Sequence, residues 1–76
     1  MAAISVRRIV KTALERNATS VVVAHNHPSG IALPSSEDRE TTVNLKTALE
    51  AVGVTLVDHI IVADGDYISL AADGLL

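Results

Sequence analysis

Two histidines and one aspartate in the middle of the chain are of types that bind metal ions. His25 and His27 form an H-x-H pair, and Asp38 closes the stretch HNHPSGIALPSSED. Because the side chains of a strand alternate between its faces, both imidazoles would lie on one side of a strand end. Two imidazole nitrogens and one carboxylate oxygen would leave the fourth tetrahedral position of a zinc ion open for water. Zinc lowers the pKa of such a water to about 7, so the pattern predicts a hydrolytic site.

The same stretch also has an interpretation that needs no metal. An H-x-H pair alone is a weak signal, and Ser35 followed by Asp38 fits a capping box at the start of a helix. The spacing alone therefore supports a metal site and an ordinary loop about equally well. Ser35 could serve in both, because its hydroxyl could cap the helix and face a bound water.

Helices and strands around this stretch would position the three side chains. Apolar residues at helical spacing predict a helix over residues 5–17, with Ser5 as its N-cap. Residues 19–24 (TSVVVA) form a nearly unbroken apolar run, typical of a central strand covered on both faces. A second helix is expected over about residues 36–51, with Gly53 as its stop. This order puts the two histidines at a strand end and the aspartate in the first turn of the second helix.

The last third of the chain predicts two more strands. Residues 54–63 (VTLVDHIIVA) form a second strand, residues 64–66 (DGD) form a hairpin turn, and residues 67–70 (YISL) form a short third strand. The last two strands would be antiparallel, and the second helix could be a right-handed crossover between the first two. We therefore expect one α/β domain over residues 1–76, in the order helix–strand–helix–strand–strand.

Composition narrows the possible functions. The chain has 76 residues, and a net charge of −3 without a basic cluster beyond Arg7 and Arg8 argues against nucleic-acid binding. The absence of cysteine excludes disulfides and thiolate ligands. No apolar run approaches the ~20 residues that a membrane span needs, and the N-terminus lacks the apolar core of a signal peptide. A cytoplasmic protein is the expectation.

The motif and its surroundings resemble a known protein family. His25, His27, Ser35 and Asp38 match the signature H-x-H-x7-S-x2-D of the JAMM (MPN+) metalloproteases. The segments AHNHPSG, DHIIV and YISL, with the closing GLL, resemble more narrowly the RadC-type branch of that family. The resemblance extends from about residue 5 to residue 76.

This resemblance implies a fold, a cofactor and an activity. The fold would be the C-terminal part of a JAB1/MPN domain, whose α/β layering is similar to that of cytidine deaminase. A zinc ion would be held by His25, His27 and Asp38, and Ser35 would orient water or stabilise the oxyanion. Relatives with the signature hydrolyse peptide or isopeptide bonds, and the RadC-type branch takes its name from an old assignment to DNA repair.

The chain also departs from the family pattern. Family members carry a catalytic glutamate upstream of the H-x-H pair, on an earlier strand, where it acts as the general base. The only acid before His25 is Glu15, which lies off the apolar stripe of the first predicted helix and is expected to be solvated. RadC-type chains usually carry an acid near the start of this helix, where Arg8 stands. The chain thus resembles a domain without its N-terminal strands, and the general base is not found in it.

Such a truncation agrees with the high apolar content of the chain. Hydrophobic residues make up 49% of the sequence, although Tyr67 is its single aromatic residue. A sheet without its first strands would leave an open edge and one face of the first helix uncovered. We therefore expect a homo-oligomer, or a partner that covers the first helix and the open edge.

Three function hypotheses follow, each from a different class. The first is a zinc hydrolase that acts on an amide bond, the second is a zinc-binding but catalytically inert interaction module, and the third is a DNA-repair accessory protein. The acidic balance counts against the third. Near the site, His59 is expected to be a packed or hydrogen-bonded histidine beside Asp58, with a place behind the zinc ion as the alternative. Asn26 is expected to point away from the two histidines and to fix the loop.

Overall fold

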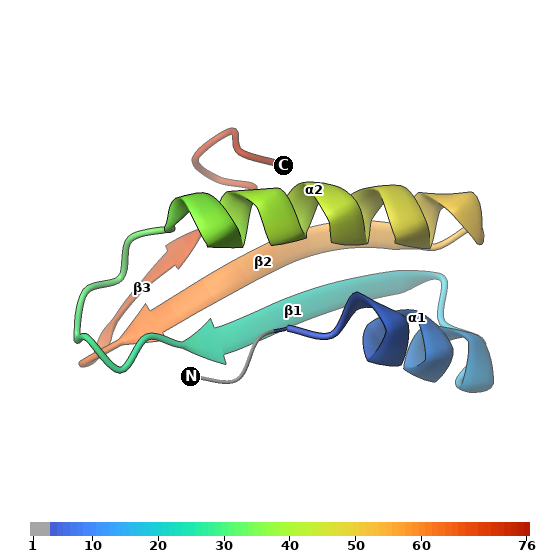
Figure 1. The fold of residues 1–76 in the computed structure, drawn as a ribbon, viewed down its shortest axis with the longest axis horizontal. Helices are drawn as coiled ribbons and strands as arrows, with labels where there is room; N and C mark the ends of the chain where they lie inside the picture. The colour runs from blue at the N-terminus through green and yellow to red at the C-terminus, as the bar shows by residue number, and fades with distance from the viewer. Residues whose placement is uncertain (1–3) are drawn as a thin grey trace.

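A computed structural model describes residues 4–76, which form two helices and a three-stranded sheet (Figure 1). The elements are α1 (Val6–Glu15), β1 (Ser20–Asn26), α2 (Ser36–Ala51), β2 (Thr55–Ala63) and β3 (Asp66–Ser69). This order confirms the predicted mixed α/β fold. Within the described part of the chain, neither helix is long and apolar enough to cross a membrane.

Helix α1 begins where the sequence predicts and ends earlier. The side chain of Ser5 accepts a hydrogen bond from the backbone amide of Arg8 at 3.2 Å, as an N-cap does. The helix ends at Glu15 instead of residue 17, because Asn17 adopts a left-handed conformation with φ of 52°. This residue turns the chain toward the start of β1.

Strand β2 lies in the centre of the sheet. β1 pairs with it in parallel, β3 pairs with it antiparallel, and a bulge interrupts the first pairing between Val21 and Val22. β1 runs to Asn26, beyond the predicted end at residue 24, because β2 is long enough to offer Val62 as a pairing partner. The turn before β3 has positive φ at both of its central residues, as the predicted hairpin requires.

Both helices pack on the same face of the sheet, and the core lies between them. Its buried residues are Ala13, Leu45, Leu49, Val54 and Leu56, with Val21 and Val23 of β1 partly buried against them. The alternate residue Val22 points to the other face and is 59% exposed. The prediction of a central strand covered on both faces is therefore wrong within residues 4–76, where β1 is an edge strand with one open face.

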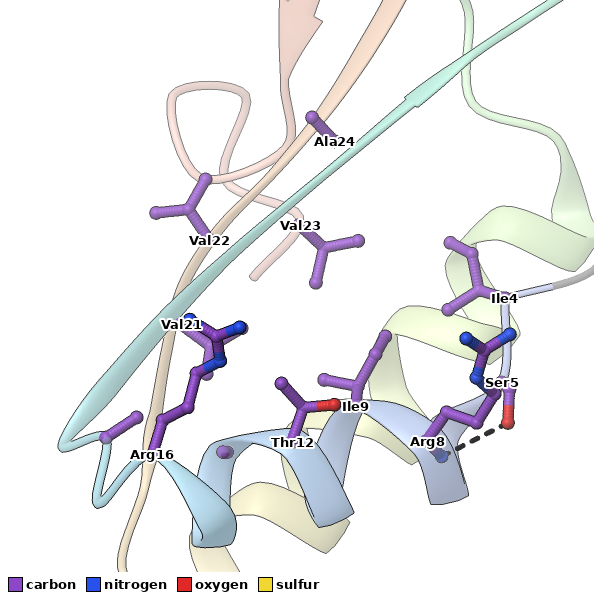
Figure 2. Close-up of a pocket in the computed structure, with 12 residues that line it drawn as sticks. Ile4, Ser5, Arg8, Ile9, Thr12, Arg16, Val21, Val22, Val23 and Ala24 are labelled. Carbon is purple, nitrogen blue, oxygen red and sulfur yellow. Dashed lines mark hydrogen bonds between the residues drawn. The ribbon is translucent and has the colours of Figure 1, made fainter.

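A groove runs along the unpaired edge of β1, between this strand and α1 (Figure 2). Its volume is about 550 Å³, and Ile9 and Val23 contribute apolar side chains to it. The edge of β1 that faces away from β2 has no strand partner within the described residues. Unpaired backbone groups beside apolar side chains favour the addition of another strand.

We propose that a second copy of the chain pairs with this edge, so the chain should self-associate at micromolar concentration. An edge strand pairs readily with its own copy, because a two-fold axis places the same backbone groups opposite each other. Sedimentation or light scattering gives the molar mass. Val22→Lys should yield monomers, because lysine on an edge strand opposes pairing.

Val43→Lys is the matched control for this experiment. Val43 is 61% exposed, close to the 59% of Val22, but it lies on α2 and not on β1. This variant should form an assembly of the same molar mass as the unmodified chain does. A folded monomer at tens of micromolar would contradict self-association through β1.

Asp58 ties the C-terminal segment to the sheet. Its carboxylate accepts hydrogen bonds from the hydroxyl of Ser69, from the amide of Ala71 at 3.0 Å and from the amide of His59 at 2.7 Å. Burial alone would raise the pKa of Asp58, but these hydrogen bonds outweigh that effect and hold the pKa below its ordinary value. The charged carboxylate therefore stabilises the folded chain.

Asp58→Asn should lower the free energy of unfolding at neutral pH by about 1–2 kcal/mol, in the range for hydrogen bonds to a charged group. A carboxyl group with a lowered folded pKa stabilises fully above its unfolded pKa, and this contribution disappears as the pH falls through the folded pKa. The difference between the two proteins should therefore shrink below about pH 4. Urea unfolding at several pH values measures it, with Asp73→Asn at an exposed position as the control. A difference that does not depend on pH would contradict the role of the charge.

Candidate metal centre

The two histidines lie at the end of β1, on the side that faces α2. His25 is the next-to-last residue of the strand, and His27 follows its last residue. The amide of His27 donates to the main-chain oxygen of Val62 at 2.9 Å, so it extends the pairing with β2. Alternation along this extended backbone therefore places both imidazoles on one side, as the sequence predicts, while Asn26 between them is exposed.

A sharp turn brings the chain from the histidines back to α2. The amide of Gly30 donates to the main-chain oxygen of His27 at 3.1 Å, and Gly30 has φ of +78°. The carboxylate of Asp64 lies against this glycine, where a Cβ atom would collide with it. Glycine is thus favoured at this turn for its conformation, since the exposed side chain of Asp64 can move away from an added Cβ atom.

Asp38 is held in place by the capping box predicted at the start of α2. The backbone amide of Ser35 donates to Oδ2 of Asp38 at 2.8 Å, and the amide of Asp38 donates to Oγ of Ser35 at 3.0 Å. The side chain of Asp38 is only 8% exposed, whereas Ser35 is exposed. The capping box therefore also fixes the direction in which the carboxylate points.

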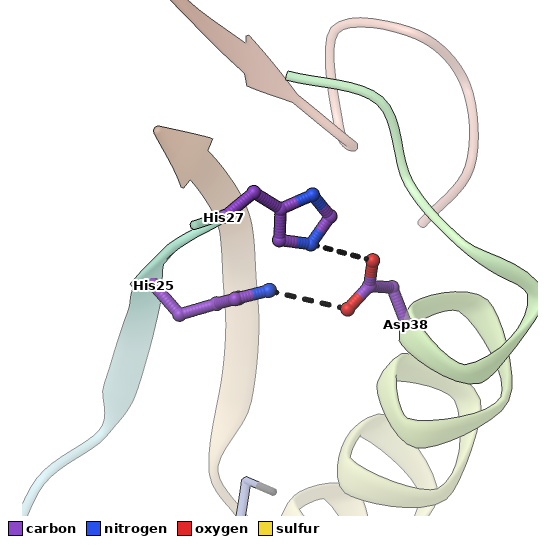
Figure 3. A group of neighbouring side chains, drawn as sticks. All are labelled: His25, His27 and Asp38. Atoms are coloured by element: carbon purple, nitrogen blue, oxygen red, sulfur yellow. Dashed lines mark ion pairs between the residues drawn. The ribbon is translucent and has the colours of Figure 1, made fainter. Parts of the chain in front are cut away.

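The three predicted ligands come together (Figure 3). Nε2 of His25 lies 3.2 Å from Oδ1 of Asp38, and Nε2 of His27 lies 3.0 Å from Oδ2. Within residues 4–76, these three side chains form the one group of histidines and acids with metal-ligand spacing. One ligand atom from each residue lies within 4.8 Å of the other two, so the three side chains could hold a single ion.

The charge of the group also suits a cation. Burial alone would raise the pKa of Asp38, but hydrogen bonds from the backbone and side chain of Ser35, with His25 and His27 nearby, outweigh it and lower the pKa. Asp38 is therefore a carboxylate at neutral pH. A buried carboxylate is stable only when its charge is compensated.

The hydrogen on His27 can be placed from its contacts. Nδ1 of His27 lies 3.2 Å from the main-chain oxygen of Ile31, and a carbonyl oxygen only accepts hydrogen bonds. Nδ1 therefore carries a hydrogen, and Nε2 faces the carboxylate of Asp38. A positive charge between Nε2 and the carboxylate, carried by a proton or by a metal ion, suits their separation of 3.0 Å. The residues present thus fit a metal ion.

His59 and Thr42 lie behind this group, in the core. His59 is completely buried, and its Nε2 lies 2.8 Å from Nδ1 of His25. Burial lowers the pKa of His59, and the nearby His25 lowers it further. His59 is thus packed and hydrogen-bonded, as expected, and its contact with His25 places it next to a candidate ligand. Thr42 was not singled out, although its position one helical turn after Asp38 places both on one face of α2.

Glu15 does not join the group. It is exposed at the end of α1 that leads into the start of β1, whereas His25 lies near the other end of that strand. The five residue steps from the start of β1 to His25 span about 16 Å, so Glu15 lies far from the candidate ligands. Arg7 and Arg8 are exposed on α1, as predicted for a solvated face.

A strand-end H-x-H pair that faces the first aspartate of the next helix defines the chain as part of a JAB-type domain. A family model described as the RadC-like JAB domain matches residues 1–75, and the chain belongs to this family. Among curated relatives, a UPF0758 protein of Marinomonas sp. (strain MWYL1) is 52% identical over 75 residues, which cover 99% of this chain and 34% of that protein.

Two further relatives agree with this assignment. A UPF0758 protein of Stutzerimonas stutzeri is 50% identical over 68 residues, which cover 90% of this chain and 30% of the relative. A UPF0758 protein of Coxiella burnetii is 48% identical over 75 residues, with 99% and 34% coverage. The chain thus spans about a third of the length of the curated relatives it matches.

Proposed function

We propose that the chain carries the metal site of a zinc-dependent hydrolase that acts on amide bonds of the peptide or isopeptide type. The observation that carries this proposal is the convergence of Nε2 of His25 and Nε2 of His27 on the carboxylate of Asp38. Zinc accepts such a mixed set of nitrogen and oxygen ligands, whereas magnesium and calcium prefer oxygen alone. The match to the RadC-like JAB domain family supports the same reading.

Each residue of the site would have its own task. His25, His27 and Asp38 would hold the zinc ion, which when bound acts as a Lewis acid and lowers the pKa of a coordinated water to about 7. The hydroxyl of Ser35 accepts a hydrogen bond from the amide of Asp38, so its own hydrogen stays available. That hydrogen could be donated to a substrate oxygen on which negative charge develops.

A specific observation favours a second candidate, a zinc-binding interaction module without activity. Among the described residues, Asp38 is the only carboxylate in the ligand group, and it is engaged by the capping box and both histidines. No second carboxylate of that group could take a proton from water. For either candidate we propose a cytoplasmic location, as the sequence predicts, which cell fractionation would test.

Calorimetric titration of the metal-free chain tests the proposed site. Zinc should bind with a stoichiometry of about one ion per chain, and magnesium should give no measurable heat at the same concentration. Zinc that binds no better than magnesium would overturn the proposal. Cleavage assays with the loaded chain then separate the hydrolase from the inert module.

A further inference from the structure

A series of hydrogen-bond contacts, buried at His59 and Thr42, connects two of the candidate ligands through the core. Nδ1 of His25 lies 2.8 Å from Nε2 of His59, and Nδ1 of His59 lies 2.6 Å from the hydroxyl of Thr42. That hydroxyl lies 2.6 Å from the main-chain oxygen of Asp38. His59 is 0% exposed and Thr42 is 2% exposed, so water does not compete for the two contacts that Thr42 makes.

Each of these hydrogen bonds has one possible donor and one possible acceptor when the rings are neutral. The main-chain oxygen of Asp38 only accepts, so Thr42 donates its one hydroxyl hydrogen to it. The oxygen of Thr42 must then accept from Nδ1 of His59, which leaves Nε2 of the neutral His59 ring as an acceptor. Nε2 of His59 accepts from Nδ1 of His25. The hydrogen of the neutral His25 ring is thereby held on Nδ1, so Nε2 is the nitrogen that faces Asp38 and is free to bind a metal ion.

The opposite direction at His25 is unfavourable. Nε2 of His59 would have to donate to His25, and with Nδ1 already donating to Thr42 the ring would carry a full charge. This charge would be completely buried, without a carboxylate in hydrogen-bond contact. Burying an unpaired charge is costly, so the neutral arrangement is selected.

We propose that His59 and Thr42 are positioning residues of the metal centre, which fix the tautomer and the orientation of His25. The inference rests on the proposed function, because it concerns how one ligand is prepared for the ion. Hydrogen-bond partners behind histidine ligands typically change metal affinity by about 10–100-fold. Neither residue would touch the ion itself.

Zinc affinity measured by competition with a chromogenic chelator tests this role. Thr42→Val removes the hydroxyl at nearly constant volume and should weaken zinc binding by about 10–100-fold. Thr42→Ser keeps the hydroxyl and should restore binding to within about two-fold of the unmodified chain. Thr47→Val makes the same change at an exposed position of α2 and should have no effect. Equal affinities of the valine and serine variants at position 42 would overturn the inference.

Nitrogen-detected NMR of the unmodified, metal-free chain needs no variant. It should show hydrogen on Nδ1 of His59 and none on its Nε2, and the reverse result would overturn the inference even if the variants fail to fold. The two proposals can fail separately. An unmodified chain that does not bind zinc refutes the zinc site. The tautomer of His59 still tests whether His59 and Thr42 orient His25. An unmodified chain that binds zinc no better than the Thr42→Val variant refutes only the positioning role of His59 and Thr42.

Discussion

Replacing His27 with alanine is expected to lower the zinc content of the purified chain from about one ion per molecule to near zero. His27 supplies one of only three protein ligands, and Nε2 lies 3.0 Å from the carboxylate with which it would share the ion. Two remaining ligands are fewer than the three or four that zinc sites in proteins use. Elemental analysis of protein expressed without added zinc measures the content.

Two variants control this experiment. Asn26→Ala changes the exposed residue between the histidines and should retain the metal. Asp38→Asn keeps an oxygen that can accept from the amide of Ser35, so the helix cap persists while the negative charge is lost. It should also lose most of the zinc. Equal zinc in the unmodified chain and the His27→Ala variant would refute the ligand assignment.

The zinc-loaded chain is expected to cleave peptide and isopeptide substrates slowly or undetectably. With zinc bound, the 76-residue chain still lacks a second carboxylate in the ligand group of residues 4–76. A positioned general base typically contributes about 10²–10⁴-fold to the rate. Assays with peptide and isopeptide substrates, followed by mass spectrometry, would determine the rate with and without a chelator.

Fast cleavage that Asp38→Ala abolishes would contradict this expectation. Glu15→Gln would then show whether Glu15 supplies the base from a second copy of the chain, since it lies away from His25 within one copy. Glu50→Gln, at another exposed glutamate in α2, is the matched control. Unchanged activity of both variants would leave the base outside these two side chains.

The candidate ligands could be found from the sequence because local structure determines the direction in which each of the three side chains points. His25 and His27 share a side by strand alternation, and a capping box places Asp38 in the first turn of a helix. Only the approach of that helix to the strand end is a tertiary contact, and the H-x-H-x7-S-x2-D signature supplied this information. The zinc ion and the role of Ser35 stay predictions.

Other features depend on pairings that no local pattern shows. The run of valines in β1 hides which side chains point inward, so the open face at Val22 was not foreseen. The extension of β1 to Asn26 depends on the length of β2, its partner. The side-chain contacts from His25 through His59 to Thr42 join three elements, and periodicity alone could not reveal them.

The double use of the Asp38 carboxylate would link metal binding at the proposed site to the order of the backbone. Oδ2 accepts from the amide of the N-cap residue Ser35 and faces His27, so an ion bound there would fasten the end of β1 to the start of α2. Residues 28–34 would then form a loop closed at both ends by one ion. An ion present at about 100 times its Kd adds about 2.7 kcal/mol to the folded state. The supply of zinc would thereby set the rigidity of the loop beside the site.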